Sequence, residues 1–89
     1  MDSNRDNIAA KIESFIVDEF QVPGDDPRFT REVHLFEEGY MSSMGFVQLL
    51  TFLETAYNVK MDEAQMFGDE FTTINGIARL VEASMAAAA

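Results

Sequence analysis

The amino-acid sequence predicts an all-α fold: a small antiparallel bundle of three main helices and one short helix, with a long first loop. Apolar residues recur at helical spacing in three separate segments, and no segment alternates apolar and polar residues over a useful length. The chain has 89 residues, which allows one domain, and 47% of them are hydrophobic, which is enough to build a core. We expect one domain over residues 1–89, with an ordered core at about 4–85 and a low-complexity alanine tail at 86–89.

The first helix is predicted over residues 4–20. Asp6 lies near its start, where a carboxylate interacts favourably with the positive end of the helix dipole. The breaker Val22-Pro23-Gly24 follows, so the helix should end before it. The apolar residues that would face the core are Ile8, Ile12, Phe15, Ile16 and Phe20.

A long connection is predicted over residues 21–42. Loops of this length without secondary structure are uncommon in compact domains and usually have a function. The region is acidic, since residues 18–38 contain seven acidic residues against two arginines. Four apolar residues should reach into the core and hold the loop in place: Phe29, Val33, Leu35 and Phe36.

The second helix is predicted over residues 43–57. Either Ser42 or Ser43 supplies the capping hydroxyl at its start, and Asn58 is a plausible stop. Val59 and Met61 should pack where the chain leaves the helix. The apolar stripe of this helix consists of Phe46, Leu49, Leu50, Leu53, Ala56 and Tyr57.

The remaining chain predicts a short helical turn over residues 62–67 and a last helix. Asp62 would cap the short turn and Gly68 would end it. The last helix should begin after Thr72 or Thr73, either of which has a hydroxyl for the cap. Its buried face would consist of Ile74, Ile77, Ala78, Val81 and Met85.

Composition excludes several kinds of function. Six basic and 16 acidic residues give a net charge of −10, which argues against binding to nucleic acid or to an anionic membrane surface and favours basic protein partners. The chain has no cysteine and one histidine, so a metal site or a catalytic triad has almost no residues to draw on. No targeting signal or membrane-spanning segment is evident, and a cytoplasmic monomer is expected.

Ser43 is the residue of greatest interest, and its position alone allows two interpretations. In the first, Ser42 or Ser43 is only a helix cap. In the second, Ser43 carries a phosphodiester, because the free N–H groups and the dipole of a helix N-terminus stabilise an anion. Tyr40, Met41 and Met44 would then surround it with adaptable apolar surface.

Three segments give the chain a family resemblance. They are Leu35-Phe36-Glu37-Glu38-Gly39, Gly39-Tyr40-Met41-Ser42-Ser43-Met44 with the following Phe46-Val47-Gln48-Leu49-Leu50, and Phe71-Thr72-Thr73-Ile74-Asn75-Gly76-Ile77. At these residues the sequence resembles the acyl and peptidyl carrier proteins, which include aminoacyl and D-alanyl carriers. The resemblance extends from about residue 8 to residue 81.

The resemblance implies that Ser43 is the attachment site of 4′-phosphopantetheine. A phosphopantetheinyl transferase would move this group from coenzyme A onto the Ser43 hydroxyl, and its thiol would carry an acyl or aminoacyl thioester. The chain would then be a non-catalytic carrier in fatty acid, polyketide or nonribosomal peptide biosynthesis. Ser42 departs from the family pattern, because it stands where the family usually has an aspartate that partners recognise.

Partner recognition is expected around the start of the second helix, at Tyr40, Met41, Ser42, Met44, Phe46, Val47 and Gln48. The partners would be the transferase, an acyl- or aminoacyl-loading enzyme and a downstream synthase or transferase. The exposed positions of this helix, Met44, Gln48, Thr51 and Thr55, are uncharged, and Glu54 is its only acid. This composition is closer to aminoacyl, D-alanyl or natural-product carriers than to the housekeeping fatty-acid carrier.

Two alternatives remain. One is an unmodified acidic helical module that binds other proteins. The other is a small hydrolase with Ser43 as nucleophile, for which His34 is the one available histidine base and would have to fold over the start of the second helix.

Overall fold

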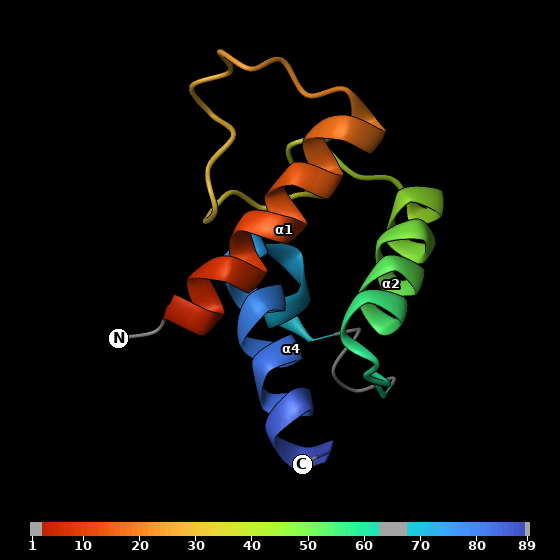
Figure 1. Cartoon of the computed structure of the whole chain (residues 1–89). Coiled ribbons are helices and arrows are strands. Elements are labelled where there is room, and N and C mark those ends of the chain that lie inside the picture. The colour runs from red at the N-terminus through yellow and green to blue at the C-terminus, as the bar shows by residue number, and fades with distance from the viewer. Residues whose placement is uncertain (1–2, 63–67, 89) are drawn as a thin grey trace.

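The structure, a computed structural model, describes residues 3–62 and 68–88. These residues form α1 (Ser3–Phe20), α2 (Ser43–Tyr57), the 3₁₀ helix η1 (Asp69–Thr72) and α4 (Ile74–Ala88). Figure 1 shows α1 and α4 crossing at the centre, with α2 beside them, and contacts join α2 to both. The all-α prediction with three main helices is confirmed, whereas antiparallel packing stays a prediction.

The predicted short helix and the predicted alanine tail differ in their outcome. The predicted short helix at residues 62–67 lies almost wholly outside the described residues, and η1 was not predicted. The alanine tail is helical as far as Ala88. Among the described helices, none is both long and apolar enough to cross a membrane.

Both predicted helix stops are confirmed, and both use a left-handed residue that is not glycine. After α1, Gln21 has φ 53°, and the Val22 N–H donates to the Val17 carbonyl at 3.3 Å. This hydrogen bond, with Val22 buried beyond the turn, is the Schellman arrangement. After α2, Asn58 adopts φ 52° and ψ 47°, a conformation that asparagine tolerates better than most residues.

Side-chain hydroxyls cap the starts of α2 and α4. Ser42 Oγ accepts a hydrogen bond from the Gly45 N–H at 3.3 Å, which makes Ser42 the cap of α2. Thr73 Oγ1 accepts from the Gly76 N–H at 2.9 Å at the start of α4. Each bond satisfies one of the donors that a helix N-terminus leaves unpaired. The sequence left open whether Ser42 or Ser43 caps α2 and whether Thr72 or Thr73 caps α4. The two hydrogen bonds identify Ser42 and Thr73 as the caps.

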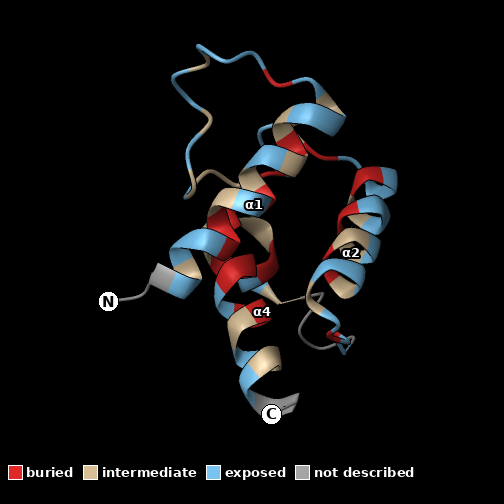
Figure 2. Ribbon diagram, in the orientation of Figure 1, coloured by how far each residue is buried: buried red, intermediate tan, exposed pale blue. Residues whose placement is uncertain are grey.

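The core lies where the inward faces of α1, α2 and α4 meet (Figure 2). Most of the predicted apolar stripes are buried or packed against it, but two predictions are wrong. Ala56 is exposed. Phe36 has 37% of its surface exposed, because Leu35 next to it takes the inward position and is completely buried. The fully buried large side chains are Ile8, Ile12, Ile16, Leu35, Leu49, Leu53, Phe71, Ile74, Ile77 and Val81.

Backbone hydrogen bonds of Leu35 hold the end of the long loop. Its N–H donates to the Thr72 carbonyl at 2.8 Å, and its carbonyl accepts from the N–H groups of Tyr40 and Met41 at 2.9 and 3.1 Å. Leu35 therefore links η1 to the turn that leads into α2. The predicted anchors Phe29 and Val33 are half-buried and pack against the core.

Arg31 fixes the middle of the loop to α1. Its guanidinium donates to Asp6 at 2.7 Å and to Glu13 at 3.3 Å, and these carboxylates, Asp6 most of all, raise the pKa of Arg31. Its carbonyl accepts from the Asn75 N–H at 3.0 Å. The loop is thus tied to α1 and α4 at Arg31 and to η1 at Leu35.

The Tyr40 hydroxyl donates to Asp26 Oδ2 at 2.7 Å, and this bond is the main reason why the pKa of Asp26 lies below its ordinary value of 3.8. The substitution Tyr40→Phe should raise the pKa of Asp26, measured by NMR titration of the carboxyl carbon. Because the folded-state pKa is depressed, the bond stabilises the fold above pH 3.8 and is lost as the pH falls through the folded-state value. In urea unfolding, acidification should therefore lower the free energy of unfolding more in wild type than in Tyr40→Phe. An equal loss in the two proteins would contradict this.

Candidate functional site

Ser43 is the first residue of α2 and is exposed. Ser42 performs the capping, so the Ser43 hydroxyl is not used for that purpose. No hydrogen bond of the Ser43 side chain is found within the described part of the chain. The first backbone hydrogen bond of α2 runs from the Phe46 N–H to the Ser42 carbonyl. The N–H groups of Ser43 and Met44 have no helical carbonyl four residues before them, which leaves them available to an anion. The first turn of α2 contains no acidic residue that would repel one.

Two glycines set the backbone around Ser43. Gly39 has φ 82° in the turn before α2, a left-handed conformation that side chains rarely adopt. Gly45 is buried against the end of α1: a Cβ there would lie 2.7 Å from the Phe20 ring and 3.3 Å from the Met41 side chain. The absence of a side chain at Gly45 thus lets the start of α2 approach α1 closely, and this contact positions Ser43.

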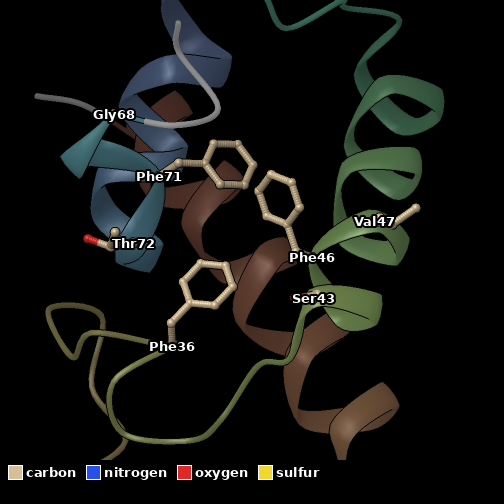
Figure 3. A pocket seen from close by; sticks show the side chains of 7 residues that line it. All are labelled: Phe36, Ser43, Phe46, Val47, Gly68, Phe71 and Thr72. Atoms are coloured by element: carbon tan, nitrogen blue, oxygen red, sulfur yellow. The ribbon is translucent and has the colours of Figure 1, made fainter. Parts of the chain in front are cut away.

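A cleft of about 460 Å³ opens directly beside Ser43. Figure 3 shows its three phenyl rings gathered around one space, with Phe36 from the loop, Phe46 from α2 and Phe71 from η1. The ring centroids of Phe46 and Phe71 are 5.1 Å apart, edge to face, and those of Phe36 and Phe46 are 5.9 Å apart. Ser43, Val47, Gly68 and Thr72 complete the lining, so none of the described lining residues is charged.

The residues predicted for partner recognition separate into three groups. Ser42, Met44, Val47 and Gln48 are exposed, with 74% of Met44 and 58% of Val47 accessible. Phe46 and Tyr40 are half-buried, Phe46 in the cleft and Tyr40 against Phe29. Met41 is only 4% exposed, so the expectation that it forms apolar surface around Ser43 is wrong. It packs near Gly45 instead, as part of the core.

His34 is held by its own loop. Its Nδ1 accepts from the Glu37 N–H at 3.1 Å, and its Nε2 lies 3.8 Å from Glu37 Oε2. Among the described residues, His34 neither lines the cleft beside Ser43 nor forms a hydrogen bond with Ser43, as the base of a hydrolase would need to do. No group of three potential metal-ligating side chains occurs within residues 3–62 and 68–88.

Sequence reasoning missed that Phe36, Phe71, Gly68 and Thr72 lie in the same site as Ser43. Phe36 was expected in the core, and Phe71 was noted only as part of a motif. Gly45 inside an amphipathic helix did signal a close approach, because a glycine there is otherwise unfavourable. The groups that approach it are Phe20 and Met41, however, and not the missed residues of the cleft.

A family model described as "Phosphopantetheine attachment site" matches residues 10–81. The chain is also similar to D-alanyl carrier proteins of Lactococcus lactis subsp. cremoris strains MG1363 and SK11 and of L. lactis subsp. lactis strain IL1403. Each is 33% identical over 58 residues, which are 65% of this chain and 73% of the relative.

Proposed function

The chain belongs to the phosphopantetheine attachment site family, and from this premise we propose that the Ser43 hydroxyl carries the covalent 4′-phosphopantetheine group. The proposal rests on the different roles of two neighbouring serines at the start of α2. Ser42 caps α2 with its hydroxyl, whereas Ser43 is exposed and its hydroxyl forms no hydrogen bond with the described residues. Modification of Ser43 would therefore break no hydrogen bond within the part of the chain that the structure describes.

The surroundings of Ser43 fit a phosphodiester. The N–H groups of Ser43 and Met44 and the positive end of the α2 dipole favour a negative charge there. Ser42 Oγ already accepts a hydrogen bond from the Gly45 N–H. The N–H groups of Ser43 and Met44 therefore remain as donors for the phosphate. The apolar cleft next to Ser43 gives the rest of the group an uncharged surface to lie against.

The bound group supplies a thiol that holds an acyl or aminoacyl group as a thioester. The chain itself presents the bound group to other enzymes. Ser42, Gly39 and Gly45 hold the start of α2 in place, and Ser43 projects from it. We propose that loading and downstream enzymes do the bond-making, and that the chain raises the local concentration of the attached group at their sites. A specialised aminoacyl or natural-product pathway is supported by the uncharged outer face of α2 and by the similarity to D-alanyl carriers.

The test uses coenzyme A, a broad-specificity phosphopantetheinyl transferase and intact-mass measurement. Transfer forms an O–P bond at Ser43, breaks the pyrophosphate bond of coenzyme A and releases adenosine 3′,5′-bisphosphate and a proton. Wild type and Ser42→Ala should each gain the mass of one group, and Ser43→Ala none. A mass gain in Ser43→Ala would overturn the assignment, and no gain in wild type would favour the unmodified interaction module.

Ser42→Asp should speed modification without altering the fold. An aspartate caps a helix as well as a serine does, and its charge adds about 0.3–1 kcal/mol with the helix dipole. It would also give basic groups of the transferase a partner that they now lack. The initial rate of loading checks this, with Ser42→Ala as the control that lowers stability by about 1 kcal/mol. A rate in Ser42→Asp at or below that of wild type would show that serine is an adequate substitute.

Partner docking is proposed at the exposed face formed by Ser42, Met44, Val47 and Gln48. The one acid of α2, Glu54, is half-buried and accepts a hydrogen bond from the Met61 N–H at 3.4 Å, so it turns back toward its own chain. Apolar and hydrogen-bonding contacts should therefore outweigh charge in docking.

Salt dependence tests this proposal. The KM of the carrier for the transferase should change less than about threefold between about 0.05 and 0.5 M sodium chloride, because screening acts on charges and this face has none. A rise of about tenfold or more would place the contact on the acidic loop instead.

A further inference from the structure

Met44 follows Ser43 directly, and it is the most exposed large apolar side chain in the described part of the chain, with 74% of its surface accessible. We propose that its thioether is a modification site, which a peroxide oxidises to the sulfoxide, and that the oxidised chain binds the transferase more weakly. The inference rests on the proposed function, because Met44 belongs to the face proposed for docking, and it adds a redox regulation of that site.

The other described methionines are sheltered. The chain has six methionines and no cysteine, so thioethers are the only sulfur groups of the unmodified chain. Met41 and Met61 are 4% and 5% exposed and belong to the core, and Met85 is half-buried against it. A buried thioether meets a peroxide only when the fold opens locally, whereas Met44 is accessible in the folded state. Met44 is therefore the described methionine that should react first.

Oxidation of the Met44 thioether needs no other group of the protein. The sulfur attacks one oxygen of hydrogen peroxide, so that an S–O bond forms and the O–O bond breaks. The sulfur loses two electrons, and the second oxygen leaves as hydroxide, which takes the proton of the sulfur-bound oxygen and becomes water. Methionine sulfoxide reductases reverse the step with a dithiol, which is oxidised to the disulfide while the oxygen leaves as water. The modification is therefore reversible.

The sulfoxide changes the chemical character of the docking face. Met44 and Val47, which is 58% exposed, are the apolar members of this face. They lie three residues apart in α2, so their side chains are neighbours on the helix surface, and Figure 3 shows Val47 pointing away from the phenyl rings. A thioether is apolar and adaptable, whereas a sulfoxide is polar and disrupts interfaces that depend on methionine. Burial of the S=O group against a partner without a hydrogen bond is unfavourable, so docking should weaken.

Two properties of α2 separate this effect from general damage. Its first turn contains no acidic residue, and Glu54, its one acid, is bonded to the Met61 N–H, so charge does not replace a lost apolar contact in docking. The side chain of Met44 is also largely outside the core, so its oxidation removes little packing from the fold. Oxidation should therefore change binding and leave stability nearly unaltered.

The first experiment measures where peroxide reacts. The full chain without the attached group is treated with hydrogen peroxide, catalase stops the reaction at successive times, and mass spectrometry of the peptides follows each methionine. Met44 should be oxidised at least about tenfold faster than Met41 and Met61, because their oxidation requires local opening. Equal rates at the three positions would overturn the proposal.

The second experiment measures docking through the kinetics of a broad-specificity transferase with coenzyme A. Oxidation should raise the KM of the carrier about tenfold and keep kcat within about twofold, because apolar contact is lost while Ser43 is unchanged. Methionine sulfoxide reductases A and B with a dithiol should restore the KM, and the urea midpoint should stay that of the untreated chain. An unchanged KM, or a loss of the urea midpoint that accompanies its rise, would overturn the proposal.

Variants assign the effect to Met44. In Met44→Leu, peroxide should leave the KM at its value before treatment, because leucine has no thioether. Met85→Leu is the matched control: it keeps Met44, so peroxide should raise its KM as in wild type. A rise of the KM in peroxide-treated Met44→Leu would contradict the assignment and place the effect on another methionine, with Met1 and Met66 lying outside the described residues.

The untreated chain separates this inference from the proposed function. Failure of untreated wild type to gain the phosphopantetheine group would contradict the proposed function, and the regulation with it. Loading that proceeds with the same KM before and after oxidation of Met44 would contradict the regulation alone.

Discussion

Replacement of Leu35 by alanine is expected to lower the free energy of unfolding by about 2–5 kcal/mol, the usual cost of truncating a fully buried leucine. Leu35 has no exposed surface, although it lies in a loop, and its backbone links Thr72 to the turn before α2. A small domain has a total stability near the lower end of about 5–15 kcal/mol, so this loss is large. Urea unfolding monitored by circular dichroism measures it.

The neighbouring substitution Phe36→Ala is the matched control. It removes more side-chain atoms than Leu35→Ala, yet it should cost less than about 1.5 kcal/mol, because Phe36 is 37% exposed and lies outside the buried core. The order of the two effects is the informative result. A larger loss for Phe36→Ala than for Leu35→Ala would mean that the phenyl ring, and not Leu35, holds the loop.

Gly76→Ala is expected to destabilise the protein by about 2–3 kcal/mol, although alanine is the better helix former. In a free helix the change would be favourable by up to about 1 kcal/mol. Here a Cβ would lie 2.0 Å from the Glu70 carbonyl oxygen and 2.8 Å from its carbonyl carbon. These are backbone atoms of η1, so the contact is relieved only by moving η1 away from α4.

Gly24→Ala provides the control for Gly76→Ala. A Cβ at Gly24 would have no atom within 4 Å, so this variant should unfold within about 0.5 kcal/mol of wild type. Gly76→Ala should also disturb the cleft, because η1 carries Phe71 and Thr72. Equal stability of Gly76→Ala and wild type would show that α4 and η1 are farther apart than the structure places them.

The helices and their ends were predictable from sequence because their causes are local. Helical spacing of apolar residues located α1, α2 and α4, and hydroxyl or breaker residues marked their ends. The choice between Ser42 and Ser43 as the cap of α2 was not predictable, since both residue types can cap. The hydrogen bond from Gly45 to Ser42 decides it, and this bond depends on where the helix begins.

The cleft could not be predicted because its causes are not local. Phe36, Phe46 and Phe71 meet only after the loop and η1 have packed against α2, and no spacing in the sequence records that contact. The positions of Phe36 and Met41 were misjudged for the same reason. Hydrophobicity alone favours the larger ring for the core, whereas the loop backbone directs Leu35 and Met41 inward and Phe36 outward.

Tandem mass spectrometry of the modified wild-type protein distinguishes Ser43 from Ser42 as the attachment site. After modification with coenzyme A and a transferase, proteolysis would release the peptide that spans both serines. Fragmentation should place the phosphopantetheine mass on Ser43 and leave Ser42, which caps α2, unmodified. The same mass on Ser42 would contradict the account, because the helix would then have lost the hydroxyl that caps it.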